Sequence, residues 1–279
     1  MKKISRRSFL AAAGLSVAAL ALTACGGSSS SVASSVASSA ASSEAASTSA
    51  AAGELTTVEA GKLTMATNAT FPPYEMTTDA GDIEGIDVET AQAIADKLGL
   101  ELQIDDMDFD AALLSVQQGK ADIVMAGVTV TDERKAVMDF SDSYATGIQS
   151  IIVPEGSDIA SPDDLAGKKI GTQRGTTGYI YCSDDFGDDA VVAYDNGLTA
   201  VQALNNGQVD AVVIDNAPAK EYVAANPGLA ILDTSYAEED YAIGMAKGSS
   251  LEDAVNAALE ELKADGTLQA IVDKYITAE

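Results

Sequence analysis

The chain has 279 residues; 16 are Lys or Arg, 43 are Asp or Glu and none is His, so its formal charge at pH 7 is −27. Such an acidic chain repels phosphate backbones, which argues against nucleic-acid binding. The absence of His excludes Ser-His-Asp and Cys-His catalysis and removes the commonest metal ligand. With only Cys25 and Cys182, no disulfide framework is expected, and we predict no cofactor and no metal site.

Residues 1–24 have the pattern of a signal peptide. Four basic residues among the first seven precede an uncharged apolar stretch at 9–22, which is short for a membrane span. The run Ser5-Arg6-Arg7-Ser8-Phe9-Leu10 is similar to a twin-arginine export signal, and an ordinary basic start fits equally well. The export route therefore stays open.

A cysteine follows the apolar stretch directly. The run Leu22-Thr23-Ala24-Cys25-Gly26 resembles the lipobox of bacterial lipoproteins. The resemblance implies that Cys25 is lipidated and becomes the new N-terminus, so we expect an extracytoplasmic protein anchored to the cell membrane through a lipid. The basic residues of the signal leave with it, and 12 Lys and Arg then face 43 Asp and Glu, a charge of −31.

Residues 25–61 are predicted to be a Ser/Ala-rich tether. Positions 26–53 are almost entirely Ser, Ala and Gly. Such a segment buries too little apolar surface to offset the entropy lost on ordering, so it is expected to be a disordered linker.

The pattern becomes globular past Leu55, with strands and helices in alternation. Taken in chain order, the predicted strands are 62–67, 100–104, 122–126, 190–194 and 210–214, and the predicted helices are 87–98, 109–118, 198–204, 251–263 and 267–275. The segments 118–124 and 206–212 are alike, since each has a Gly that ends a helix and an Asp that opens an apolar strand. The alternation predicts parallel sheets covered on both faces, and the repeat predicts two similar α/β lobes.

Ligands of open α/β sheets bind beyond the carboxyl ends of the strands. At these ends the sequence places Asn68, Gly127, Thr129, the segment 173–177 and Asp215, which come from both halves of the chain. A cleft between the two lobes is therefore the predicted site.

Several motifs, in one order and spacing, resemble the extracellular solute-binding proteins of amino-acid ABC importers, family 3. They are Asn68-Ala69-Thr70-Phe71-Pro72-Pro73-Tyr74-Glu75, Gly85-Ile86-Asp87-Val88-Glu89, the run 126–134 with Met138-Asp139-Phe140-Ser141, the run 164–171, and Ala264-Asp265-Gly266-Thr267. The resemblance extends from about Gly61 to Ile276. It implies a periplasmic binding protein type II fold, a Venus-flytrap of two lobes joined by two hinge strands. Lobe 1 would hold residues 62–144 and 242–279, and the hinge and lobe 2 would hold 145–241.

The resemblance also assigns residues to the ligand. Arg134 would bind the α-carboxylate and Asp215 the α-ammonium; Gly127 and Thr129 would add backbone groups and a hydroxyl, and Thr177 is preferred to Thr176 in the loop of lobe 2. Two aromatic residues, Phe71 and Phe109, would enclose the ligand side chain, and Asn68 and Gln173 would influence specificity.

Each assignment has a plainer alternative. Without the resemblance, Arg134 reads as a surface residue of an acidic helix start, and Asp215 as the N-cap of a helix at 216–225. A lone Phe is usually core, and each Gly is usually a turn residue. The two charged groups predict a site near charge balance. Because Asn68 stands where several relatives have Asp, a polar, neutral amino acid is the first expectation.

We therefore predict a monomeric substrate-binding lipoprotein that delivers an amino acid to a membrane permease, with no catalytic residue. An amino-acid sensor at the cell surface is the alternative, and a dehydratase-type enzyme on the same fold is a more remote one.

Overall fold

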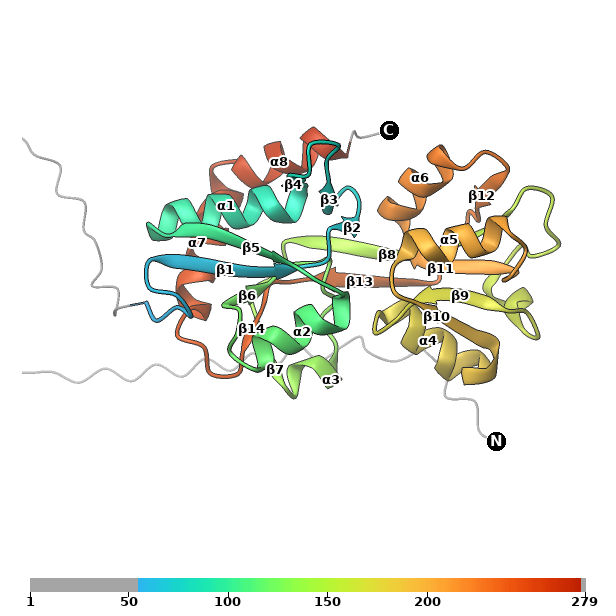
Figure 1. The fold of residues 1–279 in the computed structure, drawn as a ribbon, viewed down its shortest axis with the longest axis horizontal. Helices are drawn as coiled ribbons and strands as arrows, with labels where there is room; N and C mark the ends of the chain where they lie inside the picture. The colour runs from blue at the N-terminus through green and yellow to red at the C-terminus, as the bar shows by residue number, and fades with distance from the viewer. Residues whose placement is uncertain (1–54, 277–279) are drawn as a thin grey trace, which may run out of the picture. The chain divides into compact units, whose positions relative to one another are not determined.

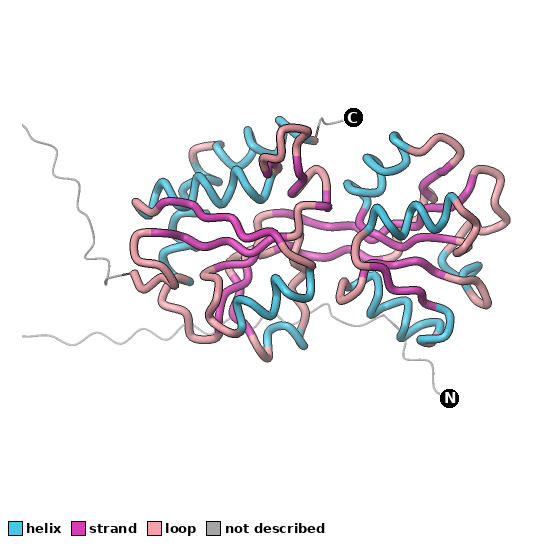
Figure 2. Tube along the Cα trace, in the orientation of Figure 1, coloured by secondary structure: helices cyan, strands magenta, loops and turns pink. Residues whose placement is uncertain are grey.

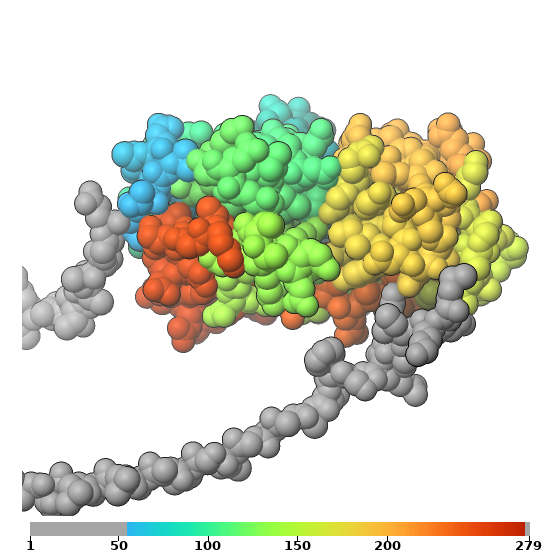
Figure 3. Space-filling view, turned by 90° about the horizontal axis from the view of Figure 1, so that it is seen from below, coloured from blue at the N-terminus to red at the C-terminus, as the bar shows by residue number. Residues whose placement is uncertain are grey.

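The computed structural model describes residues 55–276; the predicted signal peptide, Cys25 and most of the predicted tether lie outside these residues. The described residues form two lobes, each with a sheet in the middle and helices on both sides (Figures 1 and 2). We use lobe 1 for residues 55–144 and 242–276, which contain one of the two main sheets, and lobe 2 for residues 145–241, which contain the other. In Figure 3 the blue start of the described chain lies beside red segments of lobe 1, whereas lobe 2 is yellow and orange.

The sheet of lobe 1 has the strand order β5-β1-β6-β14-β7. These strands are Glu101–Asp106, Lys62–Thr67, Ile123–Val124, Gly244–Ala246 and Met138–Phe140, respectively. β5 and β6 run parallel to β1, and β14 runs antiparallel to both β6 and β7. β6 is shorter than the predicted strand at 122–126, and the Asp122 carboxylate before it accepts the N–H groups of Val58 and Thr64.

Helices cover both faces of this sheet. They are α1 (Ile86–Leu98), α2 (Phe109–Gln117), α3 (Asp132–Lys135), α7 (Glu252–Ala264) and α8 (Thr267–Tyr275). Side chains of β1 alternate between the faces: Leu63 and Met65 join the core with α1 and α7, and Ala66 joins the core with α2. A small antiparallel sheet of β2 (Thr70–Phe71), β3 (Glu75–Thr77) and β4 (Ile83–Glu84), which the sequence did not indicate, precedes α1.

The sheet of lobe 2 repeats the arrangement, with the order β10-β9-β11-β8-β12 and β13 paired to β8. These strands are Val191–Tyr194, Ile170–Gln173, Ala211–Asp215, Ala145–Pro154, Leu229–Ile231 and Ala237–Tyr241. In lobe 1, β1 lies between β5 and β6, and in lobe 2, β9 lies between β10 and β11; the three strands of each set are parallel. The predicted repeat is therefore seen in the topology. The expectation of parallel sheets is wrong in part, because each sheet also contains an antiparallel strand. β14 pairs antiparallel with β6 in lobe 1, and β8 pairs antiparallel with β11 in lobe 2.

Two layers of helix enclose the sheet of lobe 2. They are η1 (Pro162–Leu165), α4 (Thr177–Phe186), η2 (Asp188–Ala190), α5 (Gly197–Asn205) and α6 (Asn216–Ala225). Along β11, Val212 and Ile214 face one core and Val213 faces the other, as the twofold period of a strand requires. Cys182 is fully buried in the second core as a free thiol, and burial raises its pKa to about 12.

β8 and β13 are the two strands that pass between the lobes (Figure 1). They pair antiparallel over their whole contact, from Ala145 opposite Tyr241 to Gln149 opposite Ala237. Residues 55–61, which the sequence analysis placed in the tether, pack on lobe 1: Leu55 contacts its core, and the Val58 N–H donates to Asp122 at 2.7 Å. The boundary predicted at residue 61 is therefore too late. Among residues 55–276, no helix is both long enough and apolar enough to cross a membrane.

Candidate functional site

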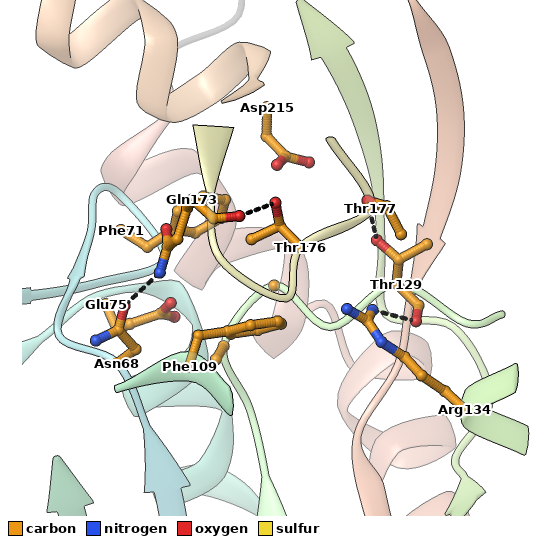
Figure 4. A pocket seen from close by; sticks show the side chains of 12 residues that line it. Asn68, Phe71, Glu75, Phe109, Thr129, Arg134, Gln173, Thr176, Thr177 and Asp215 are labelled. Carbon is orange, nitrogen blue, oxygen red and sulfur yellow. Dashed lines mark hydrogen bonds between the residues drawn. The ribbon is translucent and has the colours of Figure 1, made fainter. Parts of the chain in front are cut away.

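One cavity between the lobes brings the predicted site residues together (Figure 4). All nine line it, and three further residues do so as well. The predicted residues are Asn68, Phe71, Phe109, Gly127, Thr129, Arg134, Gln173, Thr177 and Asp215; the additional ones are Glu75, Ala126 and Thr176. The position follows from the topology, because the carboxyl ends of β1, β6, β9 and β11 all open toward this space.

Arg134 lies inside the cavity and not on the surface. Only 8% of the residue is exposed. Its Nη1 donates to the carbonyl oxygen of Thr129 at 2.8 Å, and its Nη2 donates to that of Gly175, in lobe 2, at 3.1 Å. The guanidinium lies over the Phe109 ring, 5.4 Å from the centroid. A guanidinium has five N–H donors, so it keeps donors for a carboxylate placed beside it.

The N-terminal turn of α3 fixes the backbone of Arg134. The Thr131 hydroxyl caps the helix by accepting the Arg134 N–H at 3.1 Å. The exposed neighbours Asp132 and Glu133 explain why the sequence favours a surface helix. Burial lowers the pKa of Arg134, and the charges of Glu239 and Asp215 oppose this effect, so the guanidinium stays cationic.

Asp215 stands at the N-cap position of α6, yet its side chain makes no capping bond. Its carboxylate instead accepts a hydrogen bond from the Tyr241 hydroxyl, and it is 6% exposed. Burial raises the pKa of Asp215 to about 7, and the hydrogen bond from Tyr241 lowers it. A buried carboxylate without a cation is unfavourable, so Asp215 is prepared to receive a positive group.

Gly127 requires glycine for two reasons. Its φ of +54° is left-handed, and a Cβ at this position would lie 2.7 Å from Cε1 of Phe71. Its N–H donates to Oδ2 of Asp87 at 3.0 Å, which also accepts the Tyr144 hydroxyl at 2.8 Å. This buried carboxylate therefore holds the Gly127 peptide in place.

The two threonine hydroxyls are already engaged. Thr129 and Thr177 both donate to Oε2 of Glu239, at 3.2 and 3.0 Å, and Thr176 donates to the Gln173 carbonyl at 2.8 Å while capping α4. The prediction that the Thr129 hydroxyl reaches the ligand finds no support in this arrangement, since its proton is directed to Glu239.

The other end of the cavity carries amides and aromatic rings. Gln173 of lobe 2 donates through Nε2 to Oδ1 of Asn68 of lobe 1 at 2.9 Å, so the amide pair bridges the lobes. Phe71 stacks on Tyr74, with ring centroids 5.9 Å apart, and both Phe71 and Phe109 line the cavity. Figure 4 shows Asn68, Glu75 and Phe71 toward one side and Arg134 and Thr129 toward the other.

Glu75 is the lining residue that the sequence analysis missed and that changes the electrostatics most. It is fully buried, and neither carboxylate oxygen has a hydrogen-bond donor among the described residues. Burial and the nearby Asp87 raise its pKa well above its ordinary value. Burial likewise raises the pKa of Asp87 to about 6. Glu75 adds a third ionisable group beside Arg134 and Asp215, and its raised pKa favours the neutral form, so charge balance of the site stays a prediction.

Glu239 and Tyr241 were missed for a different reason. They lie on β13, outside the motifs that carried the resemblance, and they act through contacts that form only after folding. A weak signal was present for Glu75: it is an acidic residue directly after Pro72-Pro73-Tyr74, within one of the motifs that carried the resemblance.

Comparison with known proteins agrees with this geometry. The model of the bacterial extracellular solute-binding proteins, family 3, matches residues 63–278. The chain belongs to this family. A probable histidine-binding protein of Neisseria gonorrhoeae is 34% identical over 276 residues, covering 96% of this chain and 95% of the relative.

Two solved structures have the same fold. The arginine-, lysine-, histidine-binding protein ArtJ of Geobacillus stearothermophilus superposes with a TM-score of 0.75 and 35% identity, covering 78% of this chain and 96% of its own. An ancestral arginine-binding protein bound to glutamine has a TM-score of 0.75 and 43% identity, covering 78% and 99%. The periplasmic binding protein type II fold is thus confirmed, and these family members are binding proteins and not enzymes.

Proposed function

We propose that this family 3 protein captures a free amino acid between its lobes and presents it to an ABC permease. The observation that supports this most strongly is the pairing of opposite charges in one cavity. Arg134 supplies unused donors for an α-carboxylate, and Asp215 supplies an acceptor for an α-ammonium. Similar proteins bind histidine, arginine, lysine or glutamine.

We further propose that the ligand side chain is basic, in place of the neutral one first expected. The side-chain end of the cavity holds Glu75, whose buried carboxylate has no donor among the described residues. A guanidinium or ammonium there supplies both the missing charge and the missing donors. The Asn68–Gln173 pair adds amide oxygens, and the rings of Phe71 and Phe109 suit a long aliphatic stem or a planar cation.

The test is a thermal-shift panel of the amino acids followed by calorimetry. A ligand at 100 times its Kd raises the free energy of unfolding by about 2.7 kcal/mol. We expect arginine, lysine or histidine to shift the melting temperature more than glutamine, and aspartate or glutamate to give no shift. An acidic amino acid as the best ligand would contradict the role of Glu75.

The Glu75→Gln variant separates the charge from the shape. Because this change keeps the volume and removes the carboxyl that can ionise beside a bound cation, we expect a loss of about 2–5 kcal/mol in the binding of a basic ligand. Glutamine binding should change little. An equal loss for both ligands would show that Glu75 acts on the fold and not on the charge of the ligand.

We also propose that Cys25 carries the lipid that anchors the protein outside the cytoplasm, and that the protein acts as a monomer. The lipobox-like run at 22–26 supports the anchor. Replacing Cys25 by Ser should move the protein from the membrane fraction to the soluble one; retention in the membrane would contradict the assignment.

A further inference from the structure

The hinge strand β13 carries charged side chains on both faces. Glu239 is buried, with 7% of the residue exposed, whereas its neighbours Glu238 and Asp240 are exposed. This is the alternation of a strand with one covered face. The buried carboxylate does not line the ligand cavity. Its burial therefore requires an explanation other than direct contact with the amino acid.

Three structural elements converge on one oxygen of Glu239. Its Oε2 accepts from the Thr129 hydroxyl of lobe 1 at 3.2 Å, from the Thr177 hydroxyl of lobe 2 at 3.0 Å, and from Nε2 of Gln149 on β8 at 3.0 Å. The two hydroxyls also lie 3.5 Å apart. Hydrogen bonds to an ionised group are about twice as strong as neutral ones.

The donors belong to the segments that form the site. Thr129 also offers its carbonyl to Arg134, and Thr177 is the first residue of α4, in the loop whose Gly175 carbonyl accepts from Arg134. The positions of both segments relative to the guanidinium thus depend on a residue of the hinge. The same strand continues to Tyr241, whose hydroxyl bonds Asp215.

We propose that Glu239 is a positioning residue for amino-acid capture: its carboxylate fastens the Thr129 loop of lobe 1 and the Thr177 helix start of lobe 2 to the hinge when the lobes close. The inference rests on the proposed function. Because the two hydroxyls belong to different lobes, the carboxylate binds both only in the closed arrangement. Contacts made only in one arrangement shift the equilibrium toward it. Glu239 therefore slows the escape of a bound ligand.

The experiment measures association and dissociation rates of radiolabelled L-arginine and L-glutamine with the purified protein. Glu239→Gln keeps the shape and one carbonyl acceptor but removes the charge. We expect dissociation to become about tenfold faster and association to stay within about twofold, since a closed-state contact acts on dissociation. Glu239→Asp, which keeps the charge on a shorter stem, should lie between the wild type and Glu239→Gln.

The matched control is Glu238→Gln. It removes the same charge from the same strand, one residue away, and should leave both rates unchanged. A second control combines Glu239→Gln with Thr177→Val. If Glu239 acts through the hydroxyls, the charge removal should accelerate dissociation less in the Thr177→Val background than in the wild type.

The possible results distinguish failure of the positioning role of Glu239 from failure of the proposed amino-acid capture. Equal dissociation rates for Glu239→Gln, Glu238→Gln and the wild type would overturn the positioning role and leave the proposed function standing. A lower melting temperature of Glu239→Gln with unchanged dissociation would also overturn it, because it would show a purely structural carboxylate. Failure of the wild type to bind any amino acid of the thermal-shift panel would overturn the proposed function, and the role of Glu239 with it.

Discussion

Replacing Tyr241 by Phe removes one hydroxyl group from the hinge and leaves the ring. The ring is fully buried and lies edge-on to Tyr74, at 5.3 Å between centroids and 75° between planes. It also packs on Gly147, where a Cβ would come within 2.5 Å of it. Phe fills the same space, so the change isolates the hydrogen bond to Asp215.

The size of the effect follows from the pKa of Asp215. Burial raises this pKa to about 7, and the Tyr241 hydroxyl lowers it. A hydrogen bond to a charged group contributes about 1.5–3 kcal/mol, and one pKa unit corresponds to about 1.4 kcal/mol, so Tyr241→Phe should raise the pKa by roughly 1–2 units. At pH 7 the ionised fraction would fall from about one half to roughly 1–10%, and the affinity for an ammonium would fall about 5- to 50-fold.

The assay is calorimetric titration of L-arginine from pH 5.5 to 8.5. The affinity of the wild type should rise with pH, with a midpoint near pH 7 and a plateau above it, because only the ionised Asp215 pairs with an ammonium. For Tyr241→Phe the same rise should occur at a higher pH, and the loss of affinity should shrink as pH increases. The control is Tyr236→Phe, which removes a matched buried hydroxyl that donates to Asp185 at 2.6 Å, away from the site. An unchanged midpoint for Tyr241→Phe, or an equal shift for Tyr236→Phe, would refute the reasoning.

Two further predictions follow from the same charges. Arg134→Ala should weaken the binding of every amino acid by about 2–5 kcal/mol in calorimetry, because it leaves a carboxylate unpaired, whereas Arg174→Ala, at an exposed residue, should have no effect; equal losses would contradict the assignment. Without ligand, the free energy of unfolding should fall as pH rises from about 4 to 7. The pKa values of Glu75, Asp87 and Asp215 are raised in the folded protein. The folded state therefore binds more protons than the unfolded state in this pH range, and it loses stability as these protons leave. Differential scanning calorimetry of the ligand-free protein should therefore give a higher melting temperature at pH 5 than at pH 8, and the reverse order would show that other groups dominate.

Much of the fold could be predicted because its signals are local. Apolar spacing predicted α1 and α2, and a following glycine predicted where each helix ends. Each predicted boundary lies within two residues of the observed one. The repeat of a helix, a Gly and an Asp correctly indicated two similar lobes. The antiparallel strands β8 and β14 were not predictable in the same way, because their partners are far away in the sequence and nothing local sets their direction.

In the candidate site, too, the residues marked by local sequence could be predicted, and those whose burial depends on tertiary packing could not. Residues at strand ends, such as Asn68 and Asp215, could be found from strand order and from the family motifs, and the structure brings all nine into one cavity. The buried state of Arg134 could not be found from composition, because its helix start is acidic and reads as surface. Glu75 and Glu239 could not be singled out as buried, since acidic residues are common in this chain and burial is decided by tertiary packing.

The recognition of both α-groups is the central claim, and analogues that lack one of them test it most directly. Calorimetry should compare L-arginine with its α-amide, which lacks the carboxylate for Arg134, and with its N-acetyl derivative, which lacks the ammonium for Asp215. We expect one site that binds L-arginine and loses at least about 2 kcal/mol of binding free energy with either analogue. Binding of either analogue as tightly as L-arginine would contradict the account.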